Sequence, residues 1–453
     1  MTSTSIGAAL DALADRSPDA VAVRCGDEVL RRADLQVRSR RLAGRWRRAG
    51  VPLDGVVAVV LPNGLDLVVA CVAAWRAGAV PLALSPDLPV AERQSVLREA
   101  RPWLVVDRPV DLRADESPLP DLRVASSWKL SPSSGTTGVP KLVRAAAPAT
   151  VDPDAPVAPF VPRDAVQLVS GPMTHAAPFT YAMRGLMTGH ELVVLPRFDA
   201  GDVLAAIARH RVTWAMLVPA TMQQVWRHPD RRTTDVSSLR SVLHLGARCP
   251  GPLKRDWIAW LGPDRVVEVY AGTEAQGLTM IDGREWLERP GSVGRPVPGS
   301  RFVTRDDAGR TLAPGAVGTL WMQRDGGRPG WHTLGDEGWI DADGYVHVLD
   351  RSADTIRTGG RTVHPADVEE VLDSHPAVRS SLVAGRPDDA HGVRVHAVVD
   401  TAGALVGVDE LRRWVEERLE PGRRPSSYEL VDEPLRAATG KARRRDWRGP
   451  SPR

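Results

Sequence analysis

The sequence predicts an α/β protein: a large N-terminal domain of parallel α/β sheets with a small β-rich subdomain, then a small C-terminal α+β domain. At 453 residues the chain is too long for one compact core. Strand and helix patterns alternate through most of it, which is typical of parallel sheets. From Gly291 the pattern changes to short strands with turns, and past Arg351 to a small α+β unit. We place the domain boundary at Asp350-Arg351, which gives domains 1–350 and 351–453.

The expected elements alternate in the order that this fold requires. A helix pair with a short strand pair between them occupies residues 7–50. The next expected elements are strand 56–61, a helix ending at Ala77, strand 79–84, helix 89–101, strand 103–106, strand 165–169, helix 179–189, strand 191–195, helix 202–210, strand 214–218, helix 221–227, strand 241–245 and helix 252–261. The last domain is expected to hold helix 365–374, strands 378–385 and 394–400, and helix 408–419. Loops are expected at 107–123 and 148–162.

The composition excludes several classes of function. A net charge of +3 gives no reason to expect a nucleic-acid or membrane partner. The basic tail from Lys441 to Arg453 is either an anionic-surface patch or a solvated terminus, and the second is favoured. Residues 1–20 carry acids and lack a long apolar core, so we expect no signal peptide. The most apolar stretch, 65–84, contains Arg76 and Pro81 and is expected to form a helix and a strand, not a membrane span.

The cysteines and lysines give two further indications. Three cysteines lie far apart without a CxxC spacing, which argues against a disulfide framework or structural zinc and fits a reducing cytoplasm. Of 59 basic residues only four are lysine. These lysines are expected where a compact ammonium serves better than a planar guanidinium. They are Lys129, Lys141, Lys254 and Lys441.

The densest local motif runs from Ser133 to Lys141. It contains two glycines, four hydroxyl side chains and a terminal lysine, in the order Ser133, Ser134, Gly135, Thr136, Thr137, Gly138, Val139, Pro140 and Lys141. Flexible backbone, amide and hydroxyl donors and one cation together suit a triphosphate. It is not a P-loop of the GxxxxGK[ST] kind, because the spacing differs and Leu142 follows the lysine. The alternative is a polar surface turn.

With this motif, the sequence resembles the adenylate-forming enzymes: acyl- and aryl-CoA synthetases, nonribosomal adenylation domains and luciferases. The segment Tyr270, Ala271, Gly272, Thr273 and Glu274 resembles the family's adenine and magnesium motif. The resemblance implies that Tyr270 stacks on adenine, that Thr273 contacts the α-phosphate and that Glu274 holds Mg²⁺. A carboxylate supplies the hard oxygen ligand that Mg²⁺ prefers.

Further motifs follow in the family's order. Asp336, after Gly335, matches the aspartate that binds both ribose hydroxyls, and Arg351 matches the arginine that reaches the ribose or phosphates. Gly359 and Gly360 begin a segment similar to a loop of this family. In the family that loop lines the tunnel through which a thiol reaches the acyl-adenylate in the second of the two reaction steps. Lys441, after Gly440, matches the lysine that bridges the substrate carboxylate and the α-phosphate.

The acyl-CoA synthetase branch is the most similar. The segment from Gly171 to Pro178 resembles its substrate-pocket motif, in which His175 would be the gating histidine. The alternative is a histidine satisfied in the core. Amino-acid-activating domains place an aspartate within 172–181, and no acid occurs there. An α-amino acid substrate is therefore disfavoured, because its buried ammonium would lack a partner.

Two residues depart from the family pattern. The hinge position two residues after Arg351 usually carries Asp or Lys, and here it is Ala353. The segment Gly246-Ala247-Arg248 matches a stretch near the adenine and acyl pocket, and the CoA-synthetase branch usually has proline where Arg248 stands. Arg248 either reads a second anionic or polar substrate group, serves an unusual acceptor, or is a surface arginine.

The resemblance implies an ATP- and Mg²⁺-dependent enzyme that converts a small carboxylic acid to an acyl-adenylate, releases pyrophosphate and passes the acyl group to a thiol. Coenzyme A is the favoured thiol, and a carrier-protein phosphopantetheine would serve the same chemistry. The alternatives are another acceptor, such as an amine or a small inorganic nucleophile, and a catalytically inactive binding homologue. The acid itself is not identified.

We predict that Lys441 serves only the first half-reaction. An ammonium that offsets the repulsion between carboxylate and α-phosphate in a dry site is worth about 10²–10³ in rate. Because a point charge is needed, Lys441→Arg should fail almost as badly as Lys441→Ala. Lys441→Ala should still convert a supplied acyl-adenylate and thiol to thioester at nearly the wild-type rate. Equal loss of both half-reactions in a folded variant would contradict this role.

Overall fold

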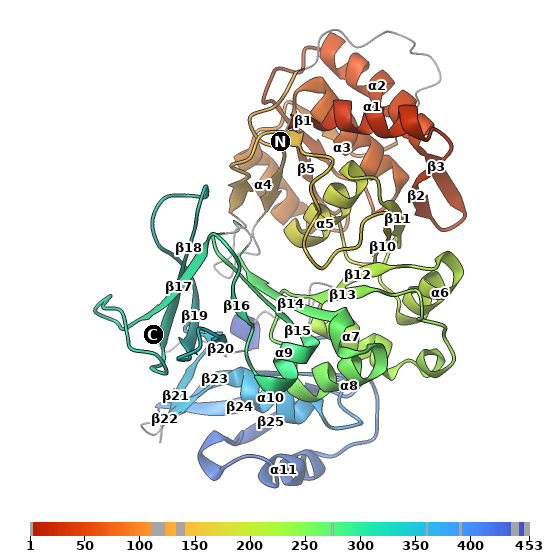
Figure 1. Cartoon of the computed structure of the whole chain (residues 1–453). Helices are drawn as coiled ribbons and strands as arrows, with labels where there is room; N and C mark the ends of the chain where they lie inside the picture. The colour runs from red at the N-terminus through yellow and green to blue at the C-terminus, as the bar shows by residue number, and fades with distance from the viewer. Residues whose placement is uncertain are drawn as a thin grey trace. The chain divides into compact units, whose positions relative to one another are not determined.

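The computed structural model describes residues 3–109, 123–132, 141–272, 274, 276–358, 361–388, 392–435 and 444–447. The chain forms two compact units (Figure 1). The first comprises Met1–Leu217 and Gln223–Leu243, and the second comprises Val218–Met222 and His244–Arg453. Helix α7 (Pro219–Arg227) and strand β13 (Ser241–His244) span points at which the chain passes from one unit to the other. The predicted boundary at Asp350-Arg351 lies inside the second unit and stays a prediction.

The first unit contains a five-stranded sheet that is parallel except at one edge. Its order is β6 (Leu104–Val106), β4 (Val56–Val59), β5 (Val80–Ala83), β7 (Leu130–Pro132) and β8 (Leu142–Arg144), with β8 antiparallel to β7. Helix α3 (Leu65–Ala77) connects β4 to β5, and all its residues except Asp66 are buried. A helix that is apolar all round is expected to be buried, which explains why this stretch is core and not a membrane span.

A second set of strands completes the first unit. The order β12 (Trp214–Leu217), β10 (Val166–Val169), β11 (Glu191–Val194) and β2 (Val21–Cys25) is parallel, and β3 (Glu28–Arg31) closes the edge as a hairpin with β2. The helices of this unit are α1 (Ile6–Arg16), α2 (Arg32–Arg48), α4 (Val90–Ala100), α5 (Ala176–Met187) and α6 (Ala200–His210). A two-residue antiparallel pair joins β1 (Thr4–Ser5) to β9 (Thr150–Val151).

The second unit is built mainly from antiparallel strands. Strands β14 (Val266–Ala271), β15 (Leu278–Asp282) and β16 (Arg295–Pro296) are followed by the four-stranded sheet β17 (Ser300–Arg305), β18 (Gly318–Arg324), β19 (His332–Ile340) and β20 (Val346–Arg351). This second sheet is the predicted β-rich subdomain. Helices α8 (Gly251–Leu261) and α9 (Gly283–Glu288) belong to the same unit.

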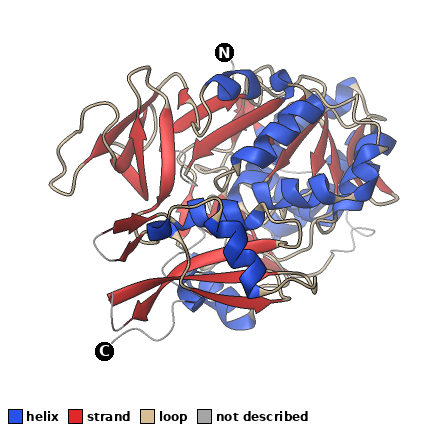
Figure 2. Cartoon of the chain, turned by 90° about the horizontal axis from the view of Figure 1, so that it is seen from below, coloured by secondary structure: helices blue, strands red, loops and turns tan. Residues whose placement is uncertain are grey.

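The chain after Arg351 forms the expected α+β arrangement. It contains the hairpin β21 (Ile356–Thr358) and β22 (Arg361–Val363), and the sheet β23 (Ser380–Asp388), β24 (Gly392–Asp400) and β25 (Ser427–Val431). Helices α10 (Pro365–Asp373) and α11 (Val408–Glu416) accompany this sheet, and α10 packs on β23. Figure 2 shows the helices and strands of the chain in a view turned by 90° from that of Figure 1. The predicted α/β fold class is therefore confirmed.

Two local differences from the sequence analysis have physical causes. Helix α5 begins at Ala176, three residues before the expected start, because Pro178 lies in its first turn, where the missing N–H needs no partner. Strand β8 was not expected, because it is only three residues long and its pairing partner β7 lies across the Ser133–Lys141 motif. No helix among the described residues is long and apolar enough to cross a membrane.

A buried ion pair joins the first three helices. Arg76 on α3 is almost fully buried and donates to both oxygens of Asp11 on α1, at 2.8 and 3.1 Å. Its Nε donates to Ser39 Oγ on α2 at 2.9 Å. Burial alone would raise the pKa of Asp11, but the hydrogen bonds from Arg76 and Arg40 outweigh it, so this pKa lies below its usual value.

We predict that Asp11→Ala lowers the free energy of unfolding by about 3–5 kcal/mol, because Arg76 would remain buried without its carboxylate. Because the folded pKa of Asp11 lies below the unfolded value, this stabilisation is present above the unfolded pKa and is lost as the pH falls below about 4. Chemical denaturation at several pH values measures both effects. Asp27→Ala, which removes an exposed pair with Arg209, is the control and should change little. An Asp11→Ala variant as stable as this control would contradict the prediction.

Candidate active site

Three predicted nucleotide-binding side chains meet in the second unit. Asp336 on β19 lies opposite Arg351 in the β19–β20 register, and Tyr270 comes from the end of β14. The Tyr270 hydroxyl donates to Asp336 Oδ2 at 2.5 Å, and Arg351 Nε lies 2.8 Å from Asp336 Oδ1. The Asp336 side chain is only 9% exposed. One carboxylate oxygen thus accepts a hydrogen bond from Tyr270, the other is ion-paired with Arg351, and the two partners come from different strands.

The electrostatics of this cluster keep Tyr270 neutral. Burial and the neighbouring Asp336 carboxylate raise the pKa of Tyr270 well above its usual range. Its hydroxyl therefore remains a hydrogen-bond donor at every ordinary pH. The ring also lies 6.2 Å from the Phe302 ring, centroid to centroid. A neutral aromatic ring held at one edge by a carboxylate suits the stacking role that the sequence predicts.

The backbone beside Tyr270 is closely packed. A Cβ atom on Gly272 would lie 2.6 Å from both Leu334 Cδ2 and Gln276 Oε1, so a larger residue would force its neighbours to move. Gly335 has a φ of +77°, a left-handed conformation that favours glycine, and its carbonyl accepts from Ser352 N at 2.8 Å. The glycines beside Tyr270 and Asp336 therefore have steric reasons to be glycine.

Glu274 is the predicted magnesium ligand. Its side chain is 38% exposed, and its Oε2 lies 3.8 Å from Nη1 of Arg328, an exposed arginine. Within the described part of the chain, no group of three or more His, Cys, Asp or Glu side chains suits a metal ion. One accessible carboxylate fits Mg²⁺ that keeps several waters and binds substrate phosphates, and Mg²⁺ commonly binds in this way. Thr273 lies outside the described residues.

The first unit holds the predicted phosphate-binding segment from Ser133 to Lys141 and the predicted gating residue His175. Residues 133–140 lie outside the described residues, and they connect the antiparallel strands β7 and β8. Lys141 comes directly before β8 and is exposed. His175 is the N-cap residue of α5 and is also exposed, so it does not pack in the core.

The segment that carries His175 is held by a residue to which the sequence analysis gave no role. Asn63 Nδ2 donates to the Gly171 carbonyl at 2.9 Å, and Asn63 Oδ1 accepts from Met173 N at 2.9 Å. Asn63 follows β4 in the turn Pro62-Asn63-Gly64. The sequence signal was only an asparagine in a turn, and its partners lie more than 100 residues away in the chain.

Lys129, a lysine outside the recognised motifs, supports the start of α5. Its Nζ donates to Thr180 Oγ1 at 2.6 Å and to the Ala176 carbonyl at 3.3 Å. Burial lowers the pKa of Lys129 to about 8, and Arg184 acts in the same direction. Lys129 precedes β7, the strand that leads into the Ser133–Lys141 motif, so it joins this strand to the first turn of α5.

Lys254, the other such lysine, is fully buried in the second unit. Its Nζ lies 2.5 Å from Glu268 Oε2 on β14. Lys254 belongs to α8, so this ion pair fixes α8 against the strand that carries Tyr270. Both lysines support elements of the site, which agrees with the expectation that lysine is retained for specific reasons.

Arg248 is held by helix α10. Its Nη1 lies 2.6 Å from Asp367 Oδ1 and its Nη2 lies 3.4 Å from Glu370 Oε2. Burial alone would lower the pKa of Arg248, but these two carboxylates outweigh it and the pKa lies above its usual range. Gly246, at the start of this segment, has a φ of +90°. The guanidinium in this structure therefore faces protein carboxylates.

Three more predicted residues lie outside the described part of the chain: Gly359 and Gly360 of the thiol loop, and Lys441. Arg444, three residues after Lys441, is described and lies against Glu369 at 2.8 Å and Asp354 at 3.3 Å. The predicted roles of Gly359, Gly360 and Lys441 stay predictions.

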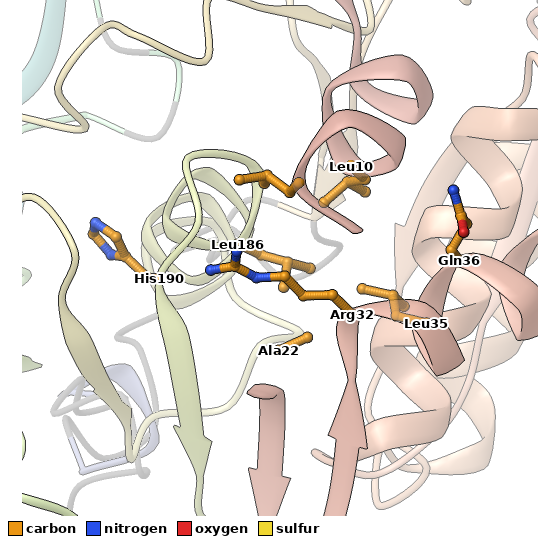
Figure 3. Close-up of a pocket in the computed structure, with 8 residues that line it drawn as sticks. Leu10, Ala22, Arg32, Leu35, Gln36, Leu186 and His190 are labelled. Carbon is orange, nitrogen blue, oxygen red and sulfur yellow. The ribbon is translucent and has the colours of Figure 1, made fainter. Parts of the chain in front are cut away.

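A small cavity in the first unit is not a candidate for the acid site. It lies by helices α1 and α2, and Figure 3 shows the Arg32 side chain reaching across it toward His190. Arg32 Nη2 donates to the Gly189 carbonyl at 2.7 Å. The space admits little more than one water molecule. Its lining residues are Leu10, Leu13, Ala22, Arg32, Leu35, Gln36, Leu186 and His190.

Comparison with known proteins identifies the family. The AMP-binding enzyme model matches residues 10–129 and 130–331, and the AMP-binding enzyme C-terminal domain model matches residues 367–441. A feruloyl-CoA synthase from Amycolatopsis sp is 32% identical over 94% of both chains.

Two solved structures are similar over nearly the whole chain. The amide bond synthetase McbA from Marinactinospora thermotolerans has a TM-score of 0.81 at 26% identity and covers 98% of this chain and 99% of its own. The o-succinylbenzoate CoA synthetase MenE from Bacillus subtilis, in complex with its acyl-adenylate, has a TM-score of 0.83 at 24% identity, covers 99% of each chain and supports the fold. The chain therefore belongs to the AMP-binding enzymes and is an adenylate-forming acid ligase of the acyl-CoA synthetase type.

Proposed function

We propose that this enzyme activates a small carboxylic acid with ATP, releases pyrophosphate, and transfers the acyl group from the acyl-adenylate to the thiol of coenzyme A. The observation that most strongly supports nucleotide binding is the buried Asp336 carboxylate between Tyr270 and Arg351. The full-length similarity to a feruloyl-CoA synthase supports the choice of acceptor. That relative also makes hydroxycinnamic acids the first acids to test.

Asp336 would change partners when ATP binds. Two ribose hydroxyls are two donors, and a carboxylate with two oxygens accepts both. The Tyr270 hydroxyl now occupies one of the roughly four acceptor sites of this carboxylate. We infer that it leaves Asp336 when the ring moves to stack on adenine, while Arg351 keeps its charge beside the carboxylate. The neutral Tyr270 ring would then stack on adenine.

In the first half-reaction, a substrate carboxylate oxygen attacks the α-phosphorus and the bond to the pyrophosphate oxygen breaks. Lys141 and Lys441 would offset the negative charge that the two reacting groups bring together. Mg²⁺ on Glu274 would neutralise part of the phosphate charge when it is bound. Thr273 and the donors of the Ser133–Gly138 segment would fix the phosphate oxygens.

In the second half-reaction, the thiol sulfur attacks the acyl carbon, the bond to the AMP oxygen breaks and the thiol proton leaves to solvent or to AMP. Gly359 and Gly360 would line the path of the thiol. We infer that the residues after Arg351 change their arrangement between the two half-reactions, so that one site serves both.

A second acceptor has a specific observation in its favour. The amide bond synthetase that resembles this chain is similar over nearly the full length of both chains. An amine nitrogen would attack the same acyl carbon, and AMP would leave in the same way. A carrier-protein thiol is a third acceptor with chemistry identical to that of coenzyme A. Because one fold serves several acceptors, the site chemistry and not the fold must decide among them.

Asp336→Ala is predicted to weaken ATP binding by about 1.5–3 kcal/mol, the scale of hydrogen bonds to a charged group. Titration calorimetry with ATP and Mg²⁺ measures the loss. The control is Asp306→Ala, which removes a partly exposed carboxylate paired with Arg310 in a hairpin of the same unit. A folded Asp336→Ala variant with unchanged ATP affinity would remove this residue from the nucleotide site.

The function itself is tested with a panel of carboxylic acids, read first by pyrophosphate release and then by the mass of the product. We expect release with at least one aromatic or aliphatic acid, and an acyl-CoA product when coenzyme A is added. If a product forms with an amine or a phosphopantetheine carrier but not with coenzyme A, the acceptor is that amine or carrier and not coenzyme A. No release with any acid, although ATP binds, would favour an inactive binding homologue.

A further inference from the structure

Arg248 joins two parts of the second unit that lie on opposite sides of the predicted hinge. Arg248 and Gly251 precede the Asp350-Arg351 junction, whereas Asp367 and Glu370 follow it on α10. The two ion pairs of Arg248 are accompanied by a hydrogen bond from Gly251 N to Glu370 Oε1 at 2.9 Å. These three interactions therefore connect chain segments that are about 120 residues apart.

The arrangement is geometrically specific. Asp367 and Glu370 are three residues apart on one helix, so both carboxylates face the same side. The forked guanidinium of Arg248 reaches both carboxylates, one with each terminal nitrogen. The compact ammonium of a lysine would bridge two carboxylates less well. The other carboxylate oxygen of Glu370 accepts a hydrogen bond from Gly251 N in the first turn of α8, where backbone N–H groups lack intrahelical partners. One face of α10 thus holds both the Gly246–Arg248 segment and the start of α8.

Other contacts lie at the junction itself. Asp350 Oδ2 accepts from Ala366 N at 2.8 Å, and Arg444 Nη1 lies 3.9 Å from Asp350 Oδ1. Asp350 is adjacent to the pivot in the chain, and its partner Ala366 is in the first turn of α10. Arg248 is remote from the pivot in the chain, so a turn that moves α10 must break its two ion pairs.

We propose that Arg248 is a positioning residue that latches residues 351–453 in the described arrangement by binding Asp367 and Glu370 on α10. The proposal rests on the proposed function, in which the two half-reactions use two arrangements. It also gives a physical account of the two departures from the family pattern. Ala353 has no polar side chain at the position where similar enzymes carry Asp or Lys, and the Arg248 ion pairs supply an anchor elsewhere.

The arrangement is tested without any reaction, by attaching spin labels on either side of the junction. Leu287→Cys and Leu405→Cys provide exposed label sites before and after it. The background is Cys25→Ser, because Cys71 and Cys249 are buried. We expect one dominant distance in the otherwise unaltered enzyme, and a second population when Arg248→Ala is added. Arg310→Ala, which removes an exposed arginine paired with Asp306, should keep the single distance.

Identical distance distributions for Arg248→Ala and Arg310→Ala would overturn the latch, whether or not the enzyme is active. Asp367→Asn combined with Glu370→Gln removes the same ion pairs from α10, together with the pair between Asp367 and Arg423, and should give the same second population. This variant keeps the test decisive if Arg248→Ala does not fold. Because the distance measurement needs no substrate, it can refute the latch without refuting the proposed function. The acid panel can likewise refute the proposed function without refuting the latch.

The half-reaction rates provide the second readout. We expect Arg248→Ala to change the ratio of adenylation to thioester rates about fivefold, the scale of a partly exposed ion pair. Asp367→Asn with Glu370→Gln should change this ratio in the same direction, and the triple variant should change it no further. Equal losses in both half-reactions would overturn the proposal, as would a loss confined to acids with a second polar group. The latter result would make Arg248 a substrate-binding residue.

Discussion

The proposed nucleotide site depends on one buried carboxylate, that of Asp336. It receives the Tyr270 hydroxyl from one strand and the Arg351 guanidinium from another. Removing it would leave a buried hydroxyl and a half-buried cation without their acceptor. Arg351 is also the last residue of β20, so the same carboxylate fixes the strand from which the C-terminal α+β part continues. The proposed nucleotide site and the start of the predicted hinge therefore share one side chain.

In the proposed function, this sharing would couple nucleotide binding to the arrangement of residues 351–453. Ribose hydroxyls that compete with Tyr270 for Asp336 would change the balance of charge around Arg351, at the beginning of the predicted hinge. Around the junction, Arg444 already pairs with three carboxylates: Asp350 before the junction, and Asp354 and Glu369 after it. Such a network favours discrete arrangements, because each buried charge needs a partner in every populated state.

Most of the fold followed from local patterns in the sequence. The apolar runs at 56–61 and 65–77 predict a strand and a helix, and the structure forms β4 and α3 there. The motif residues Tyr270 and Asp336 were grouped by family resemblance, and they lie in contact although 66 residues separate them. The start of α5 was missed, because a proline is tolerated in a first turn as well as before a helix.

The unpredicted parts of the site are long-range polar contacts. Three hydrogen bonds each join segments that are far apart in the chain: Asn63 to Gly171, Lys129 to Thr180 and Arg248 to Asp367. No periodicity or turn signal encodes such pairs, since they depend on how finished elements pack. In a chain with so many arginines, the charge of Arg248 alone did not distinguish a substrate contact from an ion pair within the protein.

The central claim is that Asp336 exchanges the Tyr270 hydroxyl for the ATP ribose. A crystal structure with a non-hydrolysable ATP analogue and Mg²⁺ tests it most directly. The account predicts both ribose hydroxyls within hydrogen-bond distance of the Asp336 carboxylate, adenine stacked on the Tyr270 ring and the metal on Glu274. A bound nucleotide whose ribose lies elsewhere, with the Tyr270–Asp336 hydrogen bond intact, would contradict it.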